Sequence, residues 1–248
     1  LFLTMSSGFN NMEARDIYID LMRKFRNEGH ELYIMFPNER RTGVPTEVVT
    51  NGRIHCLGVR TLNVTKTSIW EKGIGQLLLE KQFKSALKKH FGGVKFDLIL
   101  YSTPPITFNK VIRYAKKVSG NSAMTYLLLK DIFPQNAVDM GMLSKTGVKG
   151  ILYKMFRRKE EEMYHLSDYI GCMSPANVSY VLKHNPMVNP QKVEIAPNSV
   201  ELVSEDSMTN LKPSSILSKY GLPTDKPRFI YGGNLGVPQG IPFLIKCL

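Results

Sequence analysis

Residues 1–37 read LFLTMSSGFNNMEARDIYIDLMRKFRNEGHELYIMFP, and this stretch decides the fold. Its opening apolar run predicts a strand, and a turn that contains Gly8 leads into a segment whose apolar residues recur at helical spacing. Gly29 predicts the end of that helix, and a second apolar run predicts a strand that stops at Pro37. A strand, a helix and a strand in this order predict a βαβ unit, whose two strands are parallel.

The same alternation continues along nearly the whole chain. Further strands are predicted at residues 53–59, 96–101, 122–129, 169–173 and 192–196, and further helices at residues 68–91, 107–120, 148–167 and 174–185. The segment between residues 38 and 52 is polar and is expected to be a loop. Strands that alternate with helices pack as one sheet with helices on both faces. The predicted fold is therefore a doubly wound, Rossmann-like parallel α/β sheet.

The character of the sequence changes after residue 200. Residues 201–226 are polar and carry serines and prolines, which is typical of a linker. Residues 227–248, PRFIYGGNLGVPQGIPFLIKCL, then indicate a strand, a glycine-rich turn and the start of a helix. We therefore expect a first domain over residues 1–200, followed by the first β-turn-α unit of a truncated second Rossmann-like domain.

The chain is strongly basic. Its 248 residues include 33 Lys and Arg against 21 Asp and Glu, which gives a formal net charge of +12 and a pI near 9.5. Such a charge favours an anionic partner, and nucleic acid, an anionic membrane surface and a phosphorylated substrate all qualify. Since no nucleic-acid-binding motif is present, nucleic acid is not the expected partner.

The cysteines and histidines indicate no metal site. Cys56, Cys172 and Cys247 are far apart and form no CxxC pair, which is typical of packing thiols in a reduced, cytosolic protein. The five histidines are scattered and form no HExxH motif. The first residues lack the basic region of a signal peptide, and no run of about 18 apolar residues predicts a membrane helix. The chain also lacks an initiator Met, so we expect a few residues to be missing at its start.

Ligands of open parallel sheets bind beyond the carboxyl ends of the strands. Four segments have that position here: residues 6–11, 102–105, 130–135 and 196–200. The first places Gly8 before a predicted helix, where an anion can bind; the alternative is an ordinary turn with Asn10 or Asn11 as the helix cap.

The other three segments also have two interpretations each. Asp131 can direct its carboxylate into the ligand cleft, or it can cap a short turn. Ser102 and Pro104 can line the cleft, or they can cap a helix and set a turn. Asn198 and Ser199 follow a proline, and their ordinary role would be an Asx turn.

The helix predicted at residues 148–167 is basic on one side. Lys149, Lys154, Arg157 and Arg158 accompany a set of apolar residues, namely Ile151, Leu152, Met155 and Phe156. This composition suits an amphipathic helix that rests on anionic lipid headgroups. The helix predicted at residues 107–120 carries a second basic cluster, which adds weight to a membrane role. The alternative is a solvated helix face whose basic residues pair with glutamates one turn away.

Short motifs near the end of the chain carry a family resemblance. They are Pro197-Asn198 after a strand, Gly233-Asn234-Leu235-Gly236 and Gln239-Gly240 after the linker, and the stretch KDIFPQNAVDMG from residue 130. In these features the chain resembles the family 4 glycosyltransferases, two-domain GT-B enzymes. The similarity is greatest to the bacterial branch that assembles capsule, colanic acid or O-antigen.

The resemblance implies a retaining sugar transfer from a nucleotide sugar, UDP- or GDP-linked, without a cofactor or an obligatory metal. It implies an acceptor-side first domain and a donor-side second domain at the inner face of the cytoplasmic membrane, with a lipid-diphosphate-linked acceptor. Asp131 is the implied catalytic residue. The implied donor-binding residues are Ser7, Gly8, Asn198, Ser199, Gly233, Asn234 and Gln239, and the implied acceptor-binding residues are Asn10, Ser102 and Pro104.

The chain departs from the family pattern in two ways. Asn234 and Gln239 stand where many members carry an Arg and a Lys, and no paired-glutamate helix follows. We therefore expect the chain to bind acceptor or lipid better than donor, and not to turn over alone. An alternative function is a non-catalytic binding module on an anionic membrane surface. A nicotinamide-dependent oxidoreductase is disfavoured because the first strand-helix turn lacks the GxGxxG glycines.

Overall fold

The protein is described by a computed structural model that forms two compact units, Leu1–Val200 and Glu201–Leu248. The described residues are 1–64, 69–203, 217–223, 225–233, 235–236 and 239–247. The expected second-domain residue Asn234 lies outside them.

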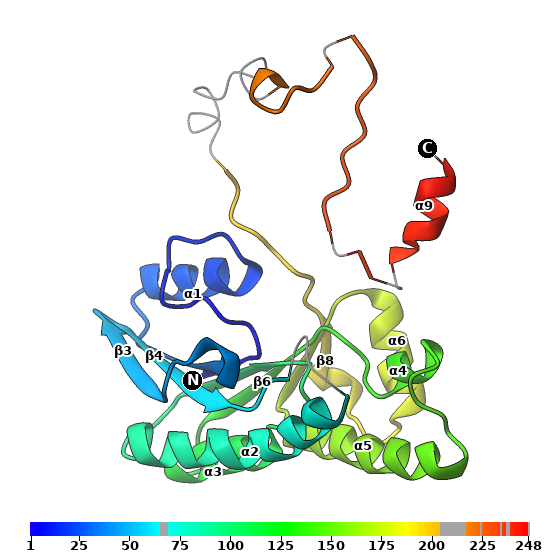
Figure 1. Ribbon diagram of the computed structural model, residues 1–248. Helices are drawn as coiled ribbons and strands as arrows, with labels where there is room; N and C mark the ends of the chain where they lie inside the picture. The colour runs from blue at the N-terminus through cyan, green and yellow to red at the C-terminus, as the bar shows by residue number, and fades with distance from the viewer. Residues whose placement is uncertain (65–68, 204–216, 224, 234, 237–238, 248) are drawn as a thin grey trace. The chain divides into compact units, whose positions relative to one another are not determined.

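The first unit is built on one sheet, and eight strands belong to it in the described part of the chain (Figure 1). They are β1 (Phe2–Leu3), β2 (Leu32–Glu39), β3 (Glu47–Asn51), β4 (Ile54–Thr61), β5 (Leu98–Ser102), β6 (Met124–Leu129), β7 (Tyr169–Cys172) and β8 (Val193–Ile195). Their order across the sheet is β3-β4-β2-β1-β5-β6-β7-β8. All neighbours are parallel except β3 and β4.

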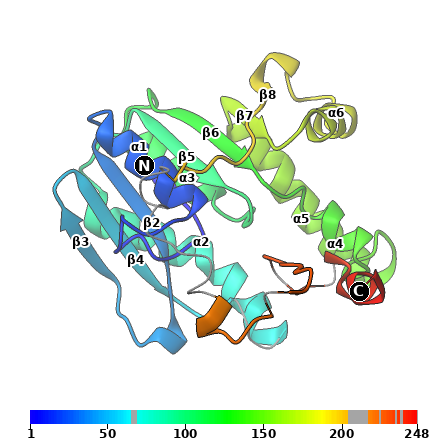
Figure 2. The same ribbon diagram turned by 90° about the horizontal axis from the view of Figure 1, so that it is seen from above.

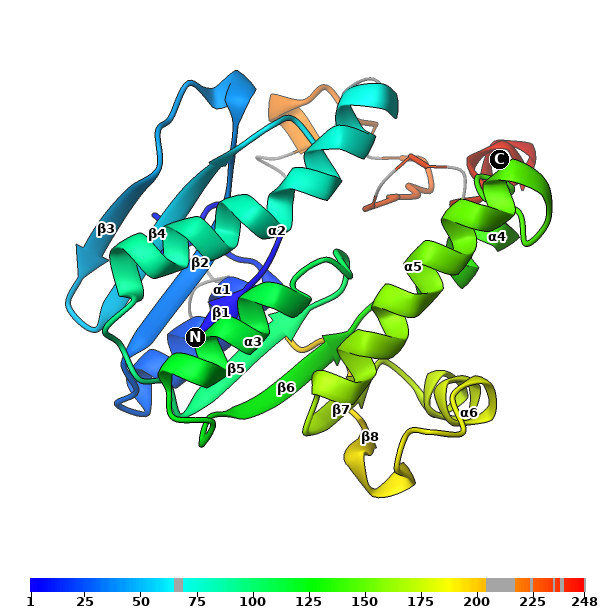
Figure 3. The same cartoon turned by 90° about the horizontal axis from the view of Figure 1, so that it is seen from below.

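Helices cover both faces of this sheet. The helices of the first unit are α1 (Ile17–Asn27), α2 (Ile69–Phe91), α3 (Asn109–Val118), α4 (Gln135–Asp139), α5 (Gly147–Leu166) and α6 (Pro175–His184). α1 lies on one face, as Figures 1 and 2 show, whereas α2, α3 and α5 lie side by side on the other face in Figure 3. The predicted doubly wound α/β fold is confirmed.

Each face has its own apolar core, because each strand directs alternate residues to opposite faces. The core under α1 contains Ile19, Met22, Phe2, Ile34 and Leu100. The core under α2, α3 and α5 is larger and contains Phe83, Leu87, Val111, Ile112, Met163, Leu3, Leu57 and Ile99.

β2 runs through Pro37 to Glu39, so the predicted stop at Pro37 is wrong. The backbone N–H of Thr4 donates to the carbonyl of Met35 (3.2 Å), so odd-numbered residues of β2 direct their backbone groups toward β1. β1 pairs only with Ile34 and Met35. Pro37 lies beyond that pairing. Proline has no N–H to donate, but β1 does not pair with this position, so no hydrogen bond of the sheet is lost.

Part of the predicted loop between residues 38 and 52 is a strand instead. β3 pairs antiparallel with β4 through a two-residue turn at Gly52 and Arg53, and Gly52 has φ 56°. A glycine at the first position of a two-residue turn between two runs of strand-forming residues is a hairpin signal, since glycine adopts positive φ without strain. The sequence thus contained the signal for this hairpin.

α1 begins later than predicted. Asp16 is the N-cap, with φ −159° and ψ 147°, and its carboxylate accepts from the backbone N–H of Tyr18 (2.9 Å). The expectation that Asn10 or Asn11 caps this helix is wrong, because Asn11 instead stabilises a turn by accepting from the N–H of Glu13 (3.1 Å).

In the second unit, α9 (Ile241–Cys247) confirms the predicted helix start. The predicted strand at residues 228–231 is not formed. A strand needs a neighbour for its backbone N–H and C=O groups, and no described residue pairs with this segment. The assignment of this unit to a nucleotide-sugar-binding domain stays a prediction.

Candidate functional site

The sheet changes its winding direction between β1 and β5. The chain passes from β1 through α1 to β2 on one side, and β5, which follows α2, pairs with β1 on its other side. The loops that follow β1 and β5 therefore diverge at the carboxyl edge of the sheet. Crevices at such switch points bind the ligands of open α/β sheets. The predicted segments 6–11 and 102–105 lie there.

The loop after β1 is open at its glycine. Gly8 has φ +98°, and no atom lies within 4 Å of the position where a Cβ would stand. Ser7, Gly8 and Asn10 are exposed, whereas the neighbouring Phe9 is buried against Phe36. The loop is thus anchored by one ring and leaves its backbone accessible to a ligand.

A buried ion pair fixes the far side of this loop. Arg23 of α1 donates to the carbonyls of Met12 (2.6 Å) and Ala14 (3.3 Å), and it also pairs with Asp20 at 2.5 Å. Sequence reasoning missed Arg23. The available signal was a pair of opposite charges, three residues apart, within the apolar face that Ile19 begins.

Hydroxyl groups join the ends of β1, β5 and α1. Thr4 Oγ1 accepts from the N–H of Ser6 (3.1 Å) and from Ser102 Oγ (3.3 Å). The Ser102 hydroxyl also interacts with the phenol of Tyr18. Ser102 is only 1% exposed, so it supports Thr4 and Tyr18 rather than offering its own hydroxyl to solvent.

Tyr18 is a site residue that sequence reasoning did not find. Burial raises its pKa, the interaction with Ser102 opposes that shift, and the nearby carboxylates of Asp16 and Asp131 raise the pKa further. The phenol consequently stays protonated and lies close enough to Asp131 to sense its charge. Tyr18 lies in the first turn of a helix that packs across β1. No local pattern in the sequence predicts that its phenol lies near Asp131.

Thr103 ties the end of β5 to the end of β6. Its Oγ1 accepts from the N–H groups of Lys130 (3.0 Å) and Asp131 (3.4 Å), and its own N–H donates to the carbonyl of Leu128 (3.1 Å). Partial burial raises the pKa of Asp131 and lowers the pKa of Lys130. Lys130 and Asp131 are consecutive residues after β6. The charged form of each side chain is therefore less stable here than it is in water.

Asp131 is exposed as a residue although its carboxyl group is partly buried, and this group has no hydrogen-bond or ion-pair partner in the part of the chain that the structure describes. Pro104, on the loop after β5, is exposed and follows Thr103, whose hydroxyl accepts from the N–H of Asp131. These residues, with Thr103 and the Gly8 loop, form the candidate site. Its groups can accept a proton, donate backbone N–H bonds and supply one positive charge.

The remaining predicted residues belong to other segments of the chain. Asn198 and Ser199 are exposed after β8, three strands from β5. Gly233 and Gln239 belong to the second unit, where the N–H of Gln239 donates to the carbonyl of Gly236 (3.2 Å). Their predicted roles stay predictions.

Among the predicted membrane residues, Arg157 is engaged inside the molecule. It pairs with Glu160 (2.7 Å) and Glu161 (3.5 Å) and donates to the carbonyl of His184 (3.0 Å), so it links α5 to α6. Lys149, Lys154 and Arg158 of α5 are exposed and have no acidic partner among the described residues.

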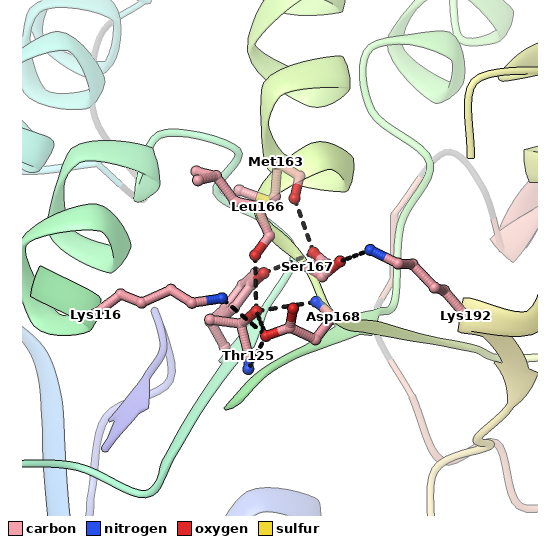
Figure 4. A network of polar contacts seen from close by, with 8 residues as sticks. Lys116, Thr125, Met163, Leu166, Ser167, Asp168 and Lys192 are labelled. Atoms are coloured by element: carbon pink, nitrogen blue, oxygen red, sulfur yellow. Dashed lines mark hydrogen bonds and ion pairs between the residues drawn. The ribbon is translucent and has the colours of Figure 1, made fainter. Parts of the chain in front are cut away.

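A second polar network lies at the opposite edge of the sheet (Figure 4). Partial burial opposes ionisation of Asp168, but bonds from Thr125 and from Lys116 (2.9 Å) lower its pKa below the ordinary value. Ser167 donates to the carbonyl of Met163 (2.8 Å) and receives a bond from Lys192 (3.4 Å). Since every group is satisfied within the network, it fixes the starts of β6 and β7 and is structural.

The described residues contain no group of three or more His, Cys, Asp and Glu side chains placed to hold a metal ion. None of their helices is long and apolar enough to cross a membrane.

No family model matches the sequence, and no curated protein sequence matches it. Solved structures do match. A trehalose-6-phosphate structure from E. coli bound with UDP-2-fluoro glucose has a TM-score of 0.56 at 10% identity, over 89% of this chain and 54% of that chain. A structure of trehalose-6-phosphate synthase, OtsA, gives the same four values. A third structure comes from a study of the mechanism of glycosyltransfer with retention that used bisubstrate glycomimetics of trehalose-6-phosphate synthase. It has a TM-score of 0.50 at 9% identity.

The chain spans about half the length of the solved structures that it matches. At 10% identity the comparison establishes the fold, and the expected GT-B type of architecture is confirmed at that level. Membership of family 4 and a role in capsule or O-antigen assembly receive no support from these matches.

Proposed function

We propose that this chain belongs to a glycosyltransferase that moves a sugar from a nucleotide sugar, UDP- or GDP-linked, to an acceptor hydroxyl with retention. The shared fold supports the proposal, because one matched structure holds UDP-2-fluoro glucose and another concerns glycosyltransfer with retention. The observation that carries it is the open Gly8 loop at the switch point of the sheet, on the same edge as Asp131, whose charge the Tyr18 phenol senses.

The reaction makes two demands that the site can meet. The bond between sugar C1 and the diphosphate oxygen breaks with its electron pair on the diphosphate, so negative charge develops there. Backbone N–H groups of the Gly8 loop and the ammonium of Lys130 can stabilise this charge without a metal ion. The acceptor oxygen bonds to C1, and we propose that Asp131 takes its proton, since a raised pKa makes a carboxylate a better base.

The finer part of the proposal concerns the acceptor and the cellular place. We propose a lipid-diphosphate-linked or saccharide acceptor of surface-polysaccharide synthesis at the inner face of the cytoplasmic membrane. The net charge of +12 supports it, because a diphosphate acceptor and an anionic bilayer both attract a basic protein. The predicted independence from metal and cofactor belongs to the same proposal.

The test measures binding of UDP-glucose and GDP-mannose by calorimetry, and then turnover in the full-length protein, for wild type and Asp131→Asn. We expect turnover to fall by about 100-fold or more, with donor binding and the folding transition retained. Asp139→Asn, an exposed carboxylate of α4, is the control and should leave turnover unchanged. If Asp131→Asn retained wild-type turnover, Asp131 would cap a turn without taking part in catalysis, and its proposed role as the base would be wrong.

The second candidate is the non-catalytic module that docks on a membrane. It is favoured by the exposed basic residues of the helices that cover one face of the sheet. Vesicle binding without any nucleotide-sugar binding by the full-length protein would select it.

A further inference from the structure

In the described part of the chain β3 is an edge strand, with β4 on its inner side and no strand on its outer side (Figures 1 and 3). The direction of its backbone groups follows from the neighbouring pairs. The N–H of Leu32 donates to the carbonyl of Arg53 (2.8 Å), so β4 turns its odd-numbered residues to β2 and its even-numbered residues to β3. The partners of those even-numbered residues are the odd-numbered residues of β3. The N–H and C=O groups of Val48 and Thr50 consequently point to the open edge.

β3 lacks the features that keep most edge strands from pairing with another chain. Such strands usually carry a bulge, a proline or a lysine, or are covered by another element. The sequence of β3, EVVTN, contains no proline and no lysine, and its register with β4 runs through all five pairs without a bulge. Every residue of β3 is exposed, and Val48 and Val49 are 37% and 43% exposed. β3 can therefore accept a further strand without rearrangement.

The two valines lie on opposite faces of the sheet. Val48 pairs with Leu57, whose side chain belongs to the core under α2, so Val48 lies on the α2 face. Val49 pairs with Cys56 of the core under α1 and lies on the α1 face. An added strand would therefore meet an apolar side chain on each face of β3.

The α2 face next to β3 also carries a cationic groove. This groove has a volume of about 470 Å³, lies between β4 and α2, and reaches Thr46, the residue before β3. Lys81 and Lys89 of α2 line it, no Asp or Glu does, and neither lysine pairs with a carboxylate among the described residues. Arg60 lines it as well and lies beside the start of β3, since its N–H donates to Thr46 Oγ1 (2.9 Å). The charge of the groove favours an acidic partner.

We propose that the open edge of β3 binds an extended acidic segment of a partner protein, which joins the sheet as a further strand. The backbone of this segment pairs with Val48 and Thr50, and its acidic side chains lie on the α2 face, where they meet Lys81 and Lys89. Its apolar side chains then lie on the α1 face, next to Val49.

A second copy of this chain is disfavoured as the partner. Each copy has a net charge of +12, and each would bring its own groove lysines toward those of the other. The contact is also separate from sugar transfer, because β4 and β2 lie between β3 and β1, which carries the Gly8 loop. Binding at this edge requires neither donor nor turnover.

The experiment measures the fluorescence anisotropy of three labelled peptides in the presence of the protein. The first alternates four glutamates with four valines, and the second alternates four lysines with four valines. The third has four glutamates separated by pairs of prolines, so it carries the charge of the first but forms no strand. We expect saturable binding of the first peptide alone. Equal binding of the two glutamate peptides would reduce the contact to charge and overturn the proposal.

Two variants test the two parts of the contact. Val48→Pro removes an outward N–H, keeps the bonds between β3 and β4, and should weaken binding of the glutamate-valine peptide roughly ten-fold, whereas Val48→Thr should bind as wild type. Lys81→Gln/Lys89→Gln should weaken binding about three- to ten-fold. Its matched control, Lys154→Gln/Lys183→Gln, removes the same charge at exposed sites of α5 and α6 and should leave binding unchanged. Equal weakening by the two lysine variants would show that only net charge matters, against the proposal.

Amide exchange followed by NMR reports the pairing itself. The glutamate-valine peptide should slow exchange of the Val48 and Thr50 N–H groups and leave the Val49 N–H unchanged, since that group already faces β4. If exchange at Val48 and Thr50 did not change, the added strand would be wrong. If sedimentation equilibrium instead showed a dimer that Val48→Pro abolishes, and no peptide bound, the edge would belong to a second copy and the acidic partner would be wrong.

Discussion

Replacement of Arg23 by Met tests whether a buried ion pair fixes the loop that carries Gly8. The guanidinium is almost fully buried, and the change removes its bonds to the carbonyls of Met12 (2.6 Å) and Ala14 (3.3 Å). It also leaves the buried carboxylate of Asp20 without the partner that now lies at 2.5 Å. Breaking a buried pair in this way costs about 3–5 kcal/mol, because a buried carboxylate that loses a cationic partner is strongly disfavoured away from water.

A second variant separates the charge from the loop. In Asp20→Asn/Arg23→Met the buried carboxylate is removed together with the guanidinium, and the expected cost falls to about 1–3 kcal/mol for the two carbonyls of the loop. The assay is urea denaturation followed by circular dichroism, with limited proteolysis to report cleavage within residues 8–16. Both variants should be cleaved there faster than wild type, while Lys24→Met, one residue along the same helix, should behave as wild type.

Three results would contradict these expectations. If Arg23→Met lowered the free energy of unfolding by less than about 1 kcal/mol, the pair would not be buried as the structure has it. If the double variant were as unstable as the single variant, the loss of the Arg23 charge beside the Asp20 carboxylate would not be the cause. If cleavage of residues 8–16 were unchanged in both variants, the Gly8 loop would not depend on Arg23.

Three further predictions follow from single residues of the first unit. Gly8→Ala should cost about 1–2 kcal/mol, because φ +98° is strained for any residue with a Cβ, and calorimetry should find weaker nucleotide-sugar binding. Partial burial raises the pKa of Asp131 above its ordinary value of 3.8, so the native state binds more protons and stability falls as the pH rises through the interval above that value. Asp131→Asn should remove this decline in urea titrations at successive pH values, and an unchanged profile would contradict it. Gly171→Ala should cost about 1–3 kcal/mol in the same assay, since its Cβ would stand 2.6 Å from both the Ala196 Cβ and the Tyr126 hydroxyl oxygen.

The sequence was a good guide to elements with a strong local period. The strand-helix alternation from residue 1 to residue 196 gave the parallel sheet, and the carboxyl-end rule placed the Gly8 loop and Asp131 at one edge of it. The predictions from sequence were wrong where a strand depends on a neighbouring strand. β3 exists because β4 lies beside it, and residues 228–231 remain without strand structure because no described segment pairs with them.

The sequence by itself therefore determined the fold class, the strongly basic charge and the loops that meet at the switch point. Only the tertiary structure decided which side chains work together there, since Tyr18, Arg23 and Thr103 come from separate elements and no spacing along the chain relates them. The physical reason is that periodicity is set by neighbours within a few residues, whereas these contacts arise from the order in which the strands join the sheet.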